Sequence, residues 1–403
     1  MSSTFKPYPA EQLISEFLKN SDENSMSNLI NHCKLYELNE NEILLLAKGL
    51  AESGEQIRFP VIEKVYDIPS TGGPSSLSTL LSPLFLKALG KNVLKLGVPG
   101  RPAGGIDVLA QIKGYQINPN IDEVKKWFSS SGYVHFLAKD NFTPLDAKLF
   151  QFRKKNNAID ISSLVIASLL SKKIAAGVQH IGLDIRVSKF GNFGKTIEEA
   201  SENGIKFNKV AKLAGLESKC FLTNGVSPQQ PYIGRGESIL ALHKIFNNSG
   251  DQLLKKHVAQ CYRMAYSICK CDYSKGISIL SILNAFEENV IVQGGSMDAF
   301  REIATIIEGE HKCAIYATTS GIFKIDLEKL RDSIIAIQNK FDDVFPDPAG
   351  VILKSSSNDF VTEGDLLCTY RCKGNYWIEF EQSLKEAFTI DNFIYSTDFK
   401  EIM

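Results

Sequence analysis

The first grouping that could do chemistry joins Arg153 with Ser168 and Lys172. Ser168 and Lys172 stand four residues apart, so on a helix they project from one face. Two cations and a hydroxyl that converge on one spot would suit a planar ligand with carbonyl oxygens. They would also stabilise negative charge that develops on this ligand as a bond breaks. The alternative is that Lys172 and Lys173 form the solvated end of a helix, where positive charge is favourable.

The second grouping is a turn rich in Ser, Thr and Gly that runs from Asp67 to Thr79, directly before a predicted helix. The backbone N–H groups of such a turn, the positive end of the helix and the hydroxyls of Ser70 and Thr79 could together hold an anion. The alternative is an ordinary turn in which Ser70 or Thr71 caps the helix.

The elements that must position these groups alternate between helix and strand after an all-helical start. From residue 11 to 53 the apolar residues recur at intervals of three and four, which predicts a small bundle of helices. The rest of the chain favours helices over 77–89, 160–176 and 327–341, and strands over 93–98 and 178–187, within 313–325 and over 364–372. This order predicts an α/β fold with an α+β C-terminal part.

Length and composition restrict the classes of protein that fit. A chain of 403 residues with 44% hydrophobic residues is long enough for two or three globular domains. With 45 basic and 46 acidic residues, its net charge of -1 supplies no field that would attract nucleic acid or an acidic membrane. The longest apolar stretch, 164–170, is far shorter than the ~20 residues of a membrane span. The N-terminal residues lack the basic start and apolar run of a signal peptide, so we expect no export signal.

The cysteines and histidines predict neither a disulfide framework nor a metal site. Eight cysteines are scattered along the chain, which fits a reducing cytoplasm. Cys261, Cys269 and Cys271 with His257 do not have a usual zinc spacing. We expect each histidine to be a satisfied surface or core residue: His32, His135, His180, His243, His257 and His311. A GxGxxG fingerprint is absent, and we expect no cofactor.

Several segments in a fixed order carry a family resemblance. They are STGG at 70–73, GRPAGGID at 100–107, FTPLDAKLFQFR at 142–153, IASLLSKKIAAGVQHIGLDIRV at 166–187 and TNGVSPQQPYIGRG at 223–236. This series closely resembles the pyrimidine-nucleoside phosphorylases, including the thymidine phosphorylases and the archaeal AMP phosphorylases. Weaker similarity continues through 284–304, 320–326 and 364–367.

The resemblance implies the architecture of the class II nucleoside phosphorylases. A small all-helical domain would face a larger α/β domain with a central mixed sheet across a hinged cleft, in a homodimer joined through the helical domains. The helical domain, which binds the base, would comprise 1–66 and about 145–176. The α/β domain, which binds phosphate and sugar, would comprise 67–144 and 177–335, followed by the C-terminal α+β part, 336–403.

The resemblance also assigns site residues. Arg153, Ser168 and Lys172 fall on the three residues that contact the uracil or thymine base in this family. On the phosphate side the family reads Lys-His-Ser-Thr-Gly-Gly, and the phosphate-binding lysine and its neighbouring histidine are Ile68 and Pro69 here. An aspartate becomes Ser76, and the threonine of the next phosphate loop becomes Gly105. The phosphate- and sugar-side candidates are therefore Ser70, Thr71, Gly72, Gly73, Thr79, Lys95, which stands where the family has a serine, and Arg101.

Three functions are open. The first is cleavage of the N-glycosidic bond of a pyrimidine nucleoside by water or an atypical acceptor, which the missing lysine slightly favours. It needs a group to orient water; Asp67, Asp107 and Asp184 are candidates, although the family role of the last two is largely structural. The second is phosphorolysis through an anion site rebuilt around Lys95, with inorganic phosphate as co-substrate. The third is a non-catalytic pyrimidine- or nucleoside-binding protein.

Overall fold

A computed structural model describes the chain over residues 9–60, 64–100, 102–137, 141–189, 191–270, 276–341 and 345–391. Two residues of the sequence analysis, Arg101 and Cys271, lie outside these ranges. Within them, no helix is both long enough and apolar enough to cross a membrane.

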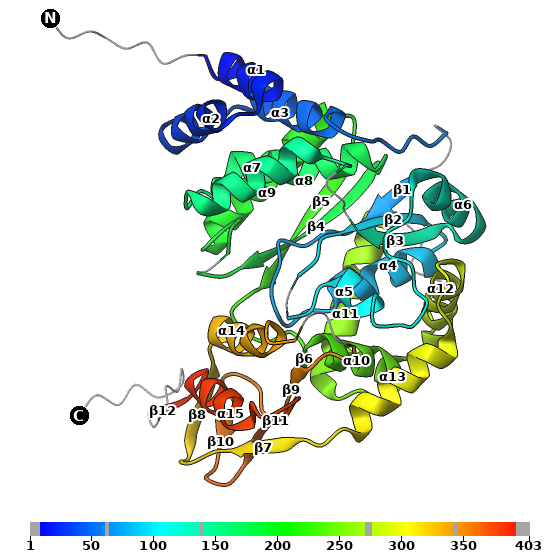
Figure 1. Cartoon of the computed structure of the whole chain (residues 1–403), viewed down its shortest axis with the longest axis vertical. Helices are drawn as coiled ribbons and strands as arrows, with labels where there is room; N and C mark the ends of the chain where they lie inside the picture. Colours follow the sequence, from blue (N-terminus) through cyan, green and yellow to red (C-terminus); the bar gives the residue numbers. More distant parts are fainter. Residues whose placement is uncertain are drawn as a thin grey trace, which may run out of the picture.

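Helices from two parts of the chain pack together at the N-terminal end of the molecule (Figure 1). They are α1 (Ala10–Asn20), α2 (Glu23–Leu35), α3 (Glu40–Glu52), α7 (Pro144–Lys155) and α8 (Ser162–Ala175). The apolar periodicity from 11 to 53 is confirmed as helical. At the start of α3, Asn39 and Glu42 form a capping box that satisfies backbone N–H groups of the first turn. The core of this layer is continuous with one face of the central sheet.

The central sheet has five parallel strands in the order β3-β2-β1-β4-β5. They are β1 (Val65–Asp67), β2 (Asn92–Gly97), β3 (Tyr133–Leu137), β4 (His180–Val187) and β5 (Glu217–Asn224). The predicted α/β class is confirmed, with one difference: the strands run parallel throughout where a mixed sheet was expected. Each strand is joined to the next by a segment that contains at least one helix. This segment carries the chain back along the sheet, so that the next strand starts at the same end and runs in the same direction.

Strand order reverses at β1, because β2 and β3 lie on one side of it and β4 and β5 on the other. In open α/β sheets, ligands bind outside the carboxyl ends of the strands at such a switch point. The turn of residues 68–77 leaves β1 here and the loop that begins at residues 98–100 leaves β2. Both sequence motifs with glycine-rich turns therefore reach the same edge of the sheet.

The helices that accompany the sheet lie on both of its faces (Figure 1). They are α4 (Ser78–Ala88), α5 (Gly105–Leu109), α6 (Ile121–Ser131), α9 (Ile197–Leu213), α10 (Arg235–Phe246), α11 (Gln252–Cys269), α12 (Ile279–Val292) and α13 (Met297–Gly309). Along β2 the buried residues alternate between the two cores, with Val93 in the core beneath α4 and α12 and Leu94 in the core beneath α8 and α9. Lys95 therefore projects to the same face as Val93.

The C-terminal part contains two small antiparallel sheets at the end of the molecule opposite α1 (Figure 1). Their order is β6-β9-β11-β7 and β10-β8-β12. The elements are β6 (Tyr232–Ile233), β7 (Cys313–Tyr316), β8 (Gly321–Ile325), α14 (Leu327–Gln338), β9 (Ala349–Leu353), β10 (Phe360–Val361), β11 (Leu366–Cys372), α15 (Trp377–Glu386) and β12 (Phe388–Asp391). The strands predicted within 313–325 and 364–372 and the helix over 327–341 are confirmed.

A third core of buried apolar residues belongs to this C-terminal part. This core contains Ile233 and buried residues from Ile315 onward, so it begins before the domain boundary expected at 336. The reason is that β6 pairs with β9 and β7 pairs with β11. Buried ion pairs connect it to α10: Arg371 Nε lies 2.6 Å from Glu237 Oε1, and Arg235 Nη2 lies 2.7 Å from Asp347 Oδ1. The division of the chain into domains, like the homodimer, stays a prediction.

Candidate active site

Two adjoining cavities lie at the carboxyl ends of the central strands. The helical-side cavity, of about 710 Å³, includes Asp146, Arg153 and Ser168 in its wall. The sheet-side cavity, of about 380 Å³, includes Lys95 and His135. The residues common to both walls are Ser70, Val98, Pro99, Leu169 and Lys172. The cavities are therefore contiguous, and Lys172 stands between them.

In the helical-side cavity, the predicted grouping of Ser168 and Lys172 is found on one face of α8. Lys172 Nζ donates to Ser168 Oγ at 3.0 Å, as their spacing of four residues predicts. The same ammonium pairs with the carboxylate of Asp146 from α7, a partner that the sequence analysis missed. The alternative of a solvated helix end is wrong, because Lys173 is 4% exposed and Lys172 lines the cavities.

Arg153 reaches the same cavity but is largely engaged by its own backbone surroundings. Its guanidinium donates to the carbonyl oxygens of Ala158, Ile159 and Leu164 at 2.9, 2.8 and 3.4 Å. Burial lowers the pKa of Arg153, although a guanidinium stays charged in proteins. These contacts take three of its five N–H donors and fix the turn between α7 and α8. Arg153 thus contributes a fixed positive charge to the cavity wall.

Lys95, Asp67 and Lys173 form a buried triad at the sheet-side cavity. The two lysines are part of the cavity wall, and Asp67 lies behind them. Lys95 Nζ lies 2.9 Å from Asp67 Oδ1 and 2.6 Å from the carbonyl oxygen of Ile68, and Lys173 Nζ pairs with Asp67 Oδ2. Burial would raise the pKa of Asp67, but the two ammonium groups outweigh it and hold the pKa below its ordinary value. Burial lowers the pKa of Lys95, and the attraction of Asp67 opposes this effect.

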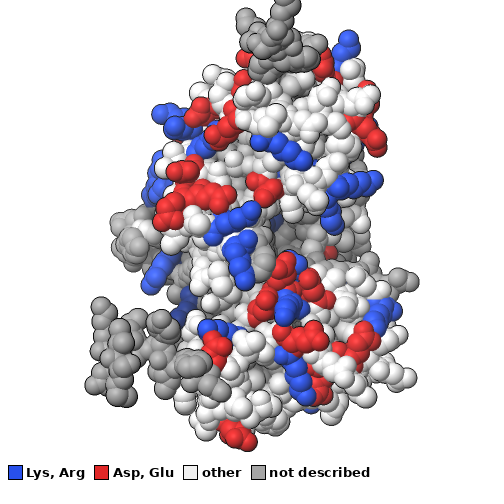
Figure 2. Space-filling model, turned by 90° about the vertical axis from the view of Figure 1, so that its left-hand side faces the viewer, with Lys and Arg blue, Asp and Glu red and all other residues white. Residues whose placement is uncertain are grey.

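The wall of the sheet-side cavity carries basic side chains and no described carboxylate. With both lysines protonated, the triad carries one positive charge that the carboxylate does not neutralise. The basic residues in the cavity wall are Lys95, Lys172, Lys173, Arg186 and Arg331, and no described carboxylate lines it. The exposed surface seen in Figure 2 differs, because acidic and basic side chains are mixed over that face. The positive field is therefore local, and a buried uncompensated charge of this kind favours a bound anion.

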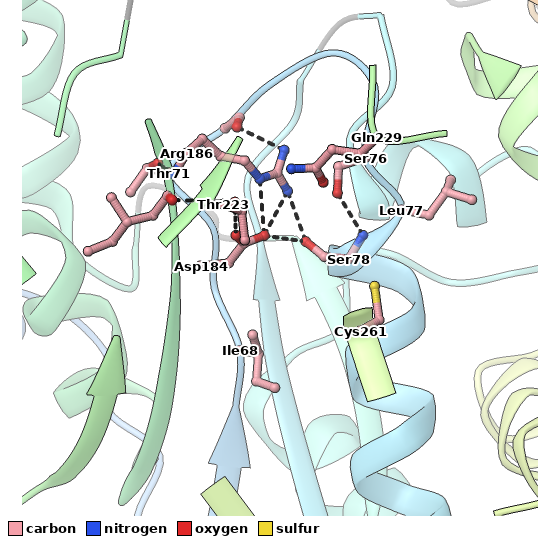
Figure 3. A network of polar contacts seen from close by, with 12 residues as sticks. Ile68, Thr71, Ser76, Leu77, Ser78, Asp184, Arg186, Thr223, Gln229 and Cys261 are labelled. Atoms are coloured by element: carbon pink, nitrogen blue, oxygen red, sulfur yellow. Dashed lines mark hydrogen bonds and ion pairs between the residues drawn. The ribbon is translucent and has the colours of Figure 1, made fainter. Parts of the chain in front are cut away.

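Arg186, on β4, forms hydrogen bonds with the turn after β1 (Figure 3). The sequence analysis did not single out this residue. Its guanidinium donates to Asp184 Oδ2 at 2.9–3.0 Å, to Ser78 Oγ at 2.9 Å and to the carbonyl oxygen of Gly72 at 3.0 Å. Gly73 has a φ of +129°, and a Cβ there would lie 2.8 Å from Arg186 Nη1. Glycine is therefore required by both its backbone conformation and the approach of the arginine.

Neither Ser70 nor Thr71 caps the helix that follows, so the capped-turn alternative is wrong in that detail. The residue before α4 is Leu77, whose N–H donates to His257 Nε2 at 2.9 Å. Thr71 instead binds β4, through its N–H to the Asp184 carbonyl oxygen and through Oγ1, which accepts from Arg186 N–H. Ser70, Gly72, Gly73 and Thr79 remain in the wall of the sheet-side cavity.

The three carboxylates considered for orienting water are all engaged elsewhere. Asp67 lies between two lysines, and Asp107 Oδ2 accepts from the N–H of Gly100 at 2.6 Å. Asp184 accepts from Arg186, Ser78 and Thr223, and these donors hold its pKa below the ordinary value although burial alone would raise it. None of the three lines either cavity. Their contacts are those of structural residues.

Two buried histidines depart from the expectation that all are satisfied: Nδ1 of His257, which lines neither cavity, and Nε2 of His135 lack a partner among the described residues. His135 on β3 is fully buried, and its Nε2 has no hydrogen-bond partner among the described residues. The described residues also contain no group of three or more His, Cys, Asp or Glu side chains that could hold a metal ion.

Comparison with known proteins finds relatives along most of the chain. It is 24% identical over 352 residues to a pyrimidine-nucleoside phosphorylase of Staphylococcus haemolyticus, covering 83% of this chain and 80% of the relative. It is 25% identical over 358 residues to a thymidine phosphorylase of Mycoplasma genitalium, covering 81% and 82%. No protein-family model matches.

Among solved structures, an anthranilate phosphoribosyltransferase from Thermus thermophilus aligns with a TM-score of 0.52 and 15% identity, over 74% of this chain and 95% of that one. This likeness concerns the fold alone. The sequence relatives and the ordered motifs agree with each other, and the chain is similar to pyrimidine-nucleoside phosphorylases over most of its length.

Proposed function

We propose that this protein cleaves the N-glycosidic bond of a pyrimidine nucleoside and transfers the pentose to inorganic phosphate. The observation that carries the choice of phosphate is the triad of Lys95, Asp67 and Lys173, whose unneutralised positive charge faces a cavity without a described carboxylate. The choice of a pyrimidine nucleoside rests on the relatives and on the polar groups of the helical-side cavity.

The helical-side cavity suits the base. Lys172, paired with Asp146 and bonded to Ser168 Oγ, presents a fixed ammonium, and Arg153 adds a second positive charge. A uracil or thymine ring has two carbonyl oxygens and a ring N–H between them. Serine can accept from the N–H while the cations donate to the carbonyl oxygens.

The sheet-side cavity suits the acceptor, and the shared wall places the sugar between the two. As the C1′–N1 bond breaks, its electron pair moves to the base, where Lys172 and Arg153 stabilise the negative charge. An oxygen of hydrogen phosphate forms the new bond to C1′, and the proton of the phosphate is finally carried by N1 of the base. The products are pentose 1-phosphate and free base.

Hydrolysis has less support, because the described cavity walls hold no free carboxylate that could orient water. Asp146 is the only described carboxylate residue lining either cavity, and it pairs with Lys172. Burial lowers the pKa of His135 to about 3, so its imidazole is a weak base near neutral pH. The missing lysine of the turn therefore does not require a change of acceptor, since Lys95 and Lys173 supply positive charge from β2 and α8.

The test is the release of free base from uridine, thymidine and deoxyuridine with and without inorganic phosphate, with the sugar product identified by chromatography. We expect pentose 1-phosphate, and only when phosphate is present. Free pentose formed equally without phosphate would overturn the proposal in favour of hydrolysis. Tight nucleoside binding with no product in either condition would overturn it in favour of a binding protein.

A further inference from the structure

His135 lies in the wall of the sheet-side cavity, next to Lys95. The two residues are register partners on the parallel strands β2 and β3, so their side chains project to the same face of the sheet. Both line the cavity, and His135 is fully buried. The register thus places an imidazole beside an ammonium group at the place proposed for the acceptor.

One nitrogen of the His135 imidazole, Nε2, has no described hydrogen-bond partner. Burial lowers the pKa of His135 to about 3, so the ring is neutral and has one N–H. Tyr133 Oη lies 3.5 Å from Nδ1, and burial raises the pKa of this phenol, which keeps its proton. In the tautomer in which the hydroxyl donates to Nδ1, the ring proton lies on Nε2. Nε2 is the atom without a partner among the described residues, and a buried unpaired donor is costly.

Two glycines make the space that the ring occupies. A Cβ at Gly97 would lie 2.9 Å from His135 Nε2, and a Cβ at Gly105 would lie 3.0 Å from His135 Cε1 and 2.9 Å from Thr79 Oγ1. A threonine at position 105, which the family resemblance leads one to expect, would collide with the imidazole. The exchange of that side chain for glycine and the presence of His135 are therefore parts of one arrangement.

The ring's position is fixed through its backbone. Gln293, at the end of α12, accepts from His135 N–H and donates to the His135 carbonyl oxygen, both at 2.9 Å. Asn289 donates to Gln293 Oε1 at 2.8 Å, which orients the amide. These contacts replace the strand partner that β3 lacks at the sheet edge. The backbone that carries the imidazole is thus held in place before any ligand binds.

We propose that His135 binds the acceptor anion, with its Nε2–H donating to a phosphate oxygen beside the Lys95 ammonium. The inference rests on the proposed phosphate-dependent reaction. In this inference His135, on β3, takes the place of polar residues that the family carries in the two glycine-rich loops.

The experiment compares His135→Met, which removes the donor at similar length, with His135→Gln, which keeps an amide N–H near the position of Nε2. His311→Gln, an exposed site in the C-terminal part, is the control. We expect the KM for inorganic phosphate to rise about tenfold or more in the methionine variant, to recover most of that loss in the glutamine variant, and to stay unchanged in the control. The KM for uridine should not move in any of them.

A second measurement needs no working variant. In the wild-type protein labelled with ¹⁵N-histidine, adding inorganic phosphate at constant ionic strength should shift the imidazole signals of His135, and an equal addition of chloride should not. If the wild type needs phosphate but neither this signal nor the KM for phosphate responds, His135 is not the ligand and the inference is overturned. If the wild type shows no phosphate dependence and no phosphate binding, the proposed function itself fails.

Discussion

Replacing Lys95 with methionine changes the charge of the buried triad in a defined way. Two ammonium groups and one carboxylate give +1 in the wild type, and Lys95→Met gives zero because Asp67 keeps its contact with Lys173. The variant also removes the ammonium from the cavity wall. A hydrogen bond to a charged group contributes about 1.5–3 kcal/mol, and each ~1.4 kcal/mol is a factor of ten. The KM for phosphate should therefore rise about 10- to 150-fold.

The assay is the initial rate of uracil release at saturating uridine as phosphate is varied at constant ionic strength, since salt screens the attraction. Lys91→Met, at the residue that precedes β2, is the matched control and should behave like the wild type. Because Asp67 retains one lysine, we expect a folded variant with a cooperative thermal transition. An unchanged KM for phosphate in that folded variant would refute the assignment of the acceptor site to the triad.

Three further outcomes follow from the geometry. Lys172→Met should lower kcat about 10²- to 10³-fold, as loss of a preorganised donor does, and should lower the thermal midpoint as well, because it leaves the buried Asp146 carboxylate without its partner; wild-type kcat would remove Lys172 from the base site. Gly73→Ala should destabilise the fold and weaken phosphate binding, because of the φ of +129° and the Arg186 contact at 2.8 Å; a fully stable variant would contradict this account of the turn. Burial lowers the pKa of His135 to about 3 and that of His257 to about 4. Both histidines bind protons more readily in the unfolded chain than in the folded one. The free energy of unfolding should therefore be highest above pH ~6.5 and should fall toward pH 4, by about 1.4 kcal/mol per pH unit for each histidine. A free energy of urea unfolding that stays constant from pH 7 to pH 5 would contradict this.

Local pattern was sufficient for the elements and for one pair in the site. Ser168 and Lys172 could be matched from their spacing because a helix has a fixed periodicity, and the two side chains are in contact. The strands over 93–98 and 178–187 were recognisable because they are short apolar runs between turns. The mixed sheet that the family resemblance implied was wrong for the central sheet, whose described strands are all parallel.

The anion cavity could not be read from the sequence because its members meet only through tertiary structure. Lys95 and His135 are 40 positions apart and become neighbours through the register of β2 and β3. The sequence allowed Lys173 to be a surface residue at the end of a helix, but in the structure its ammonium pairs with the carboxylate of Asp67. The glycines at 97 and 105 are the one local feature that indicates space for another side chain. The sequence does not identify the side chain that fills this space.

The central claim is that a phosphate oxygen, and not water, becomes bonded to C1′. Turnover of uridine with phosphate labelled by ¹⁸O at all four oxygens, followed by mass spectrometry of the sugar product, tests this directly. The account predicts pentose 1-phosphate that retains the four labelled oxygens, including the one bonded to C1′. Free pentose carrying an oxygen from unlabelled water, formed at the same rate without phosphate, would contradict it.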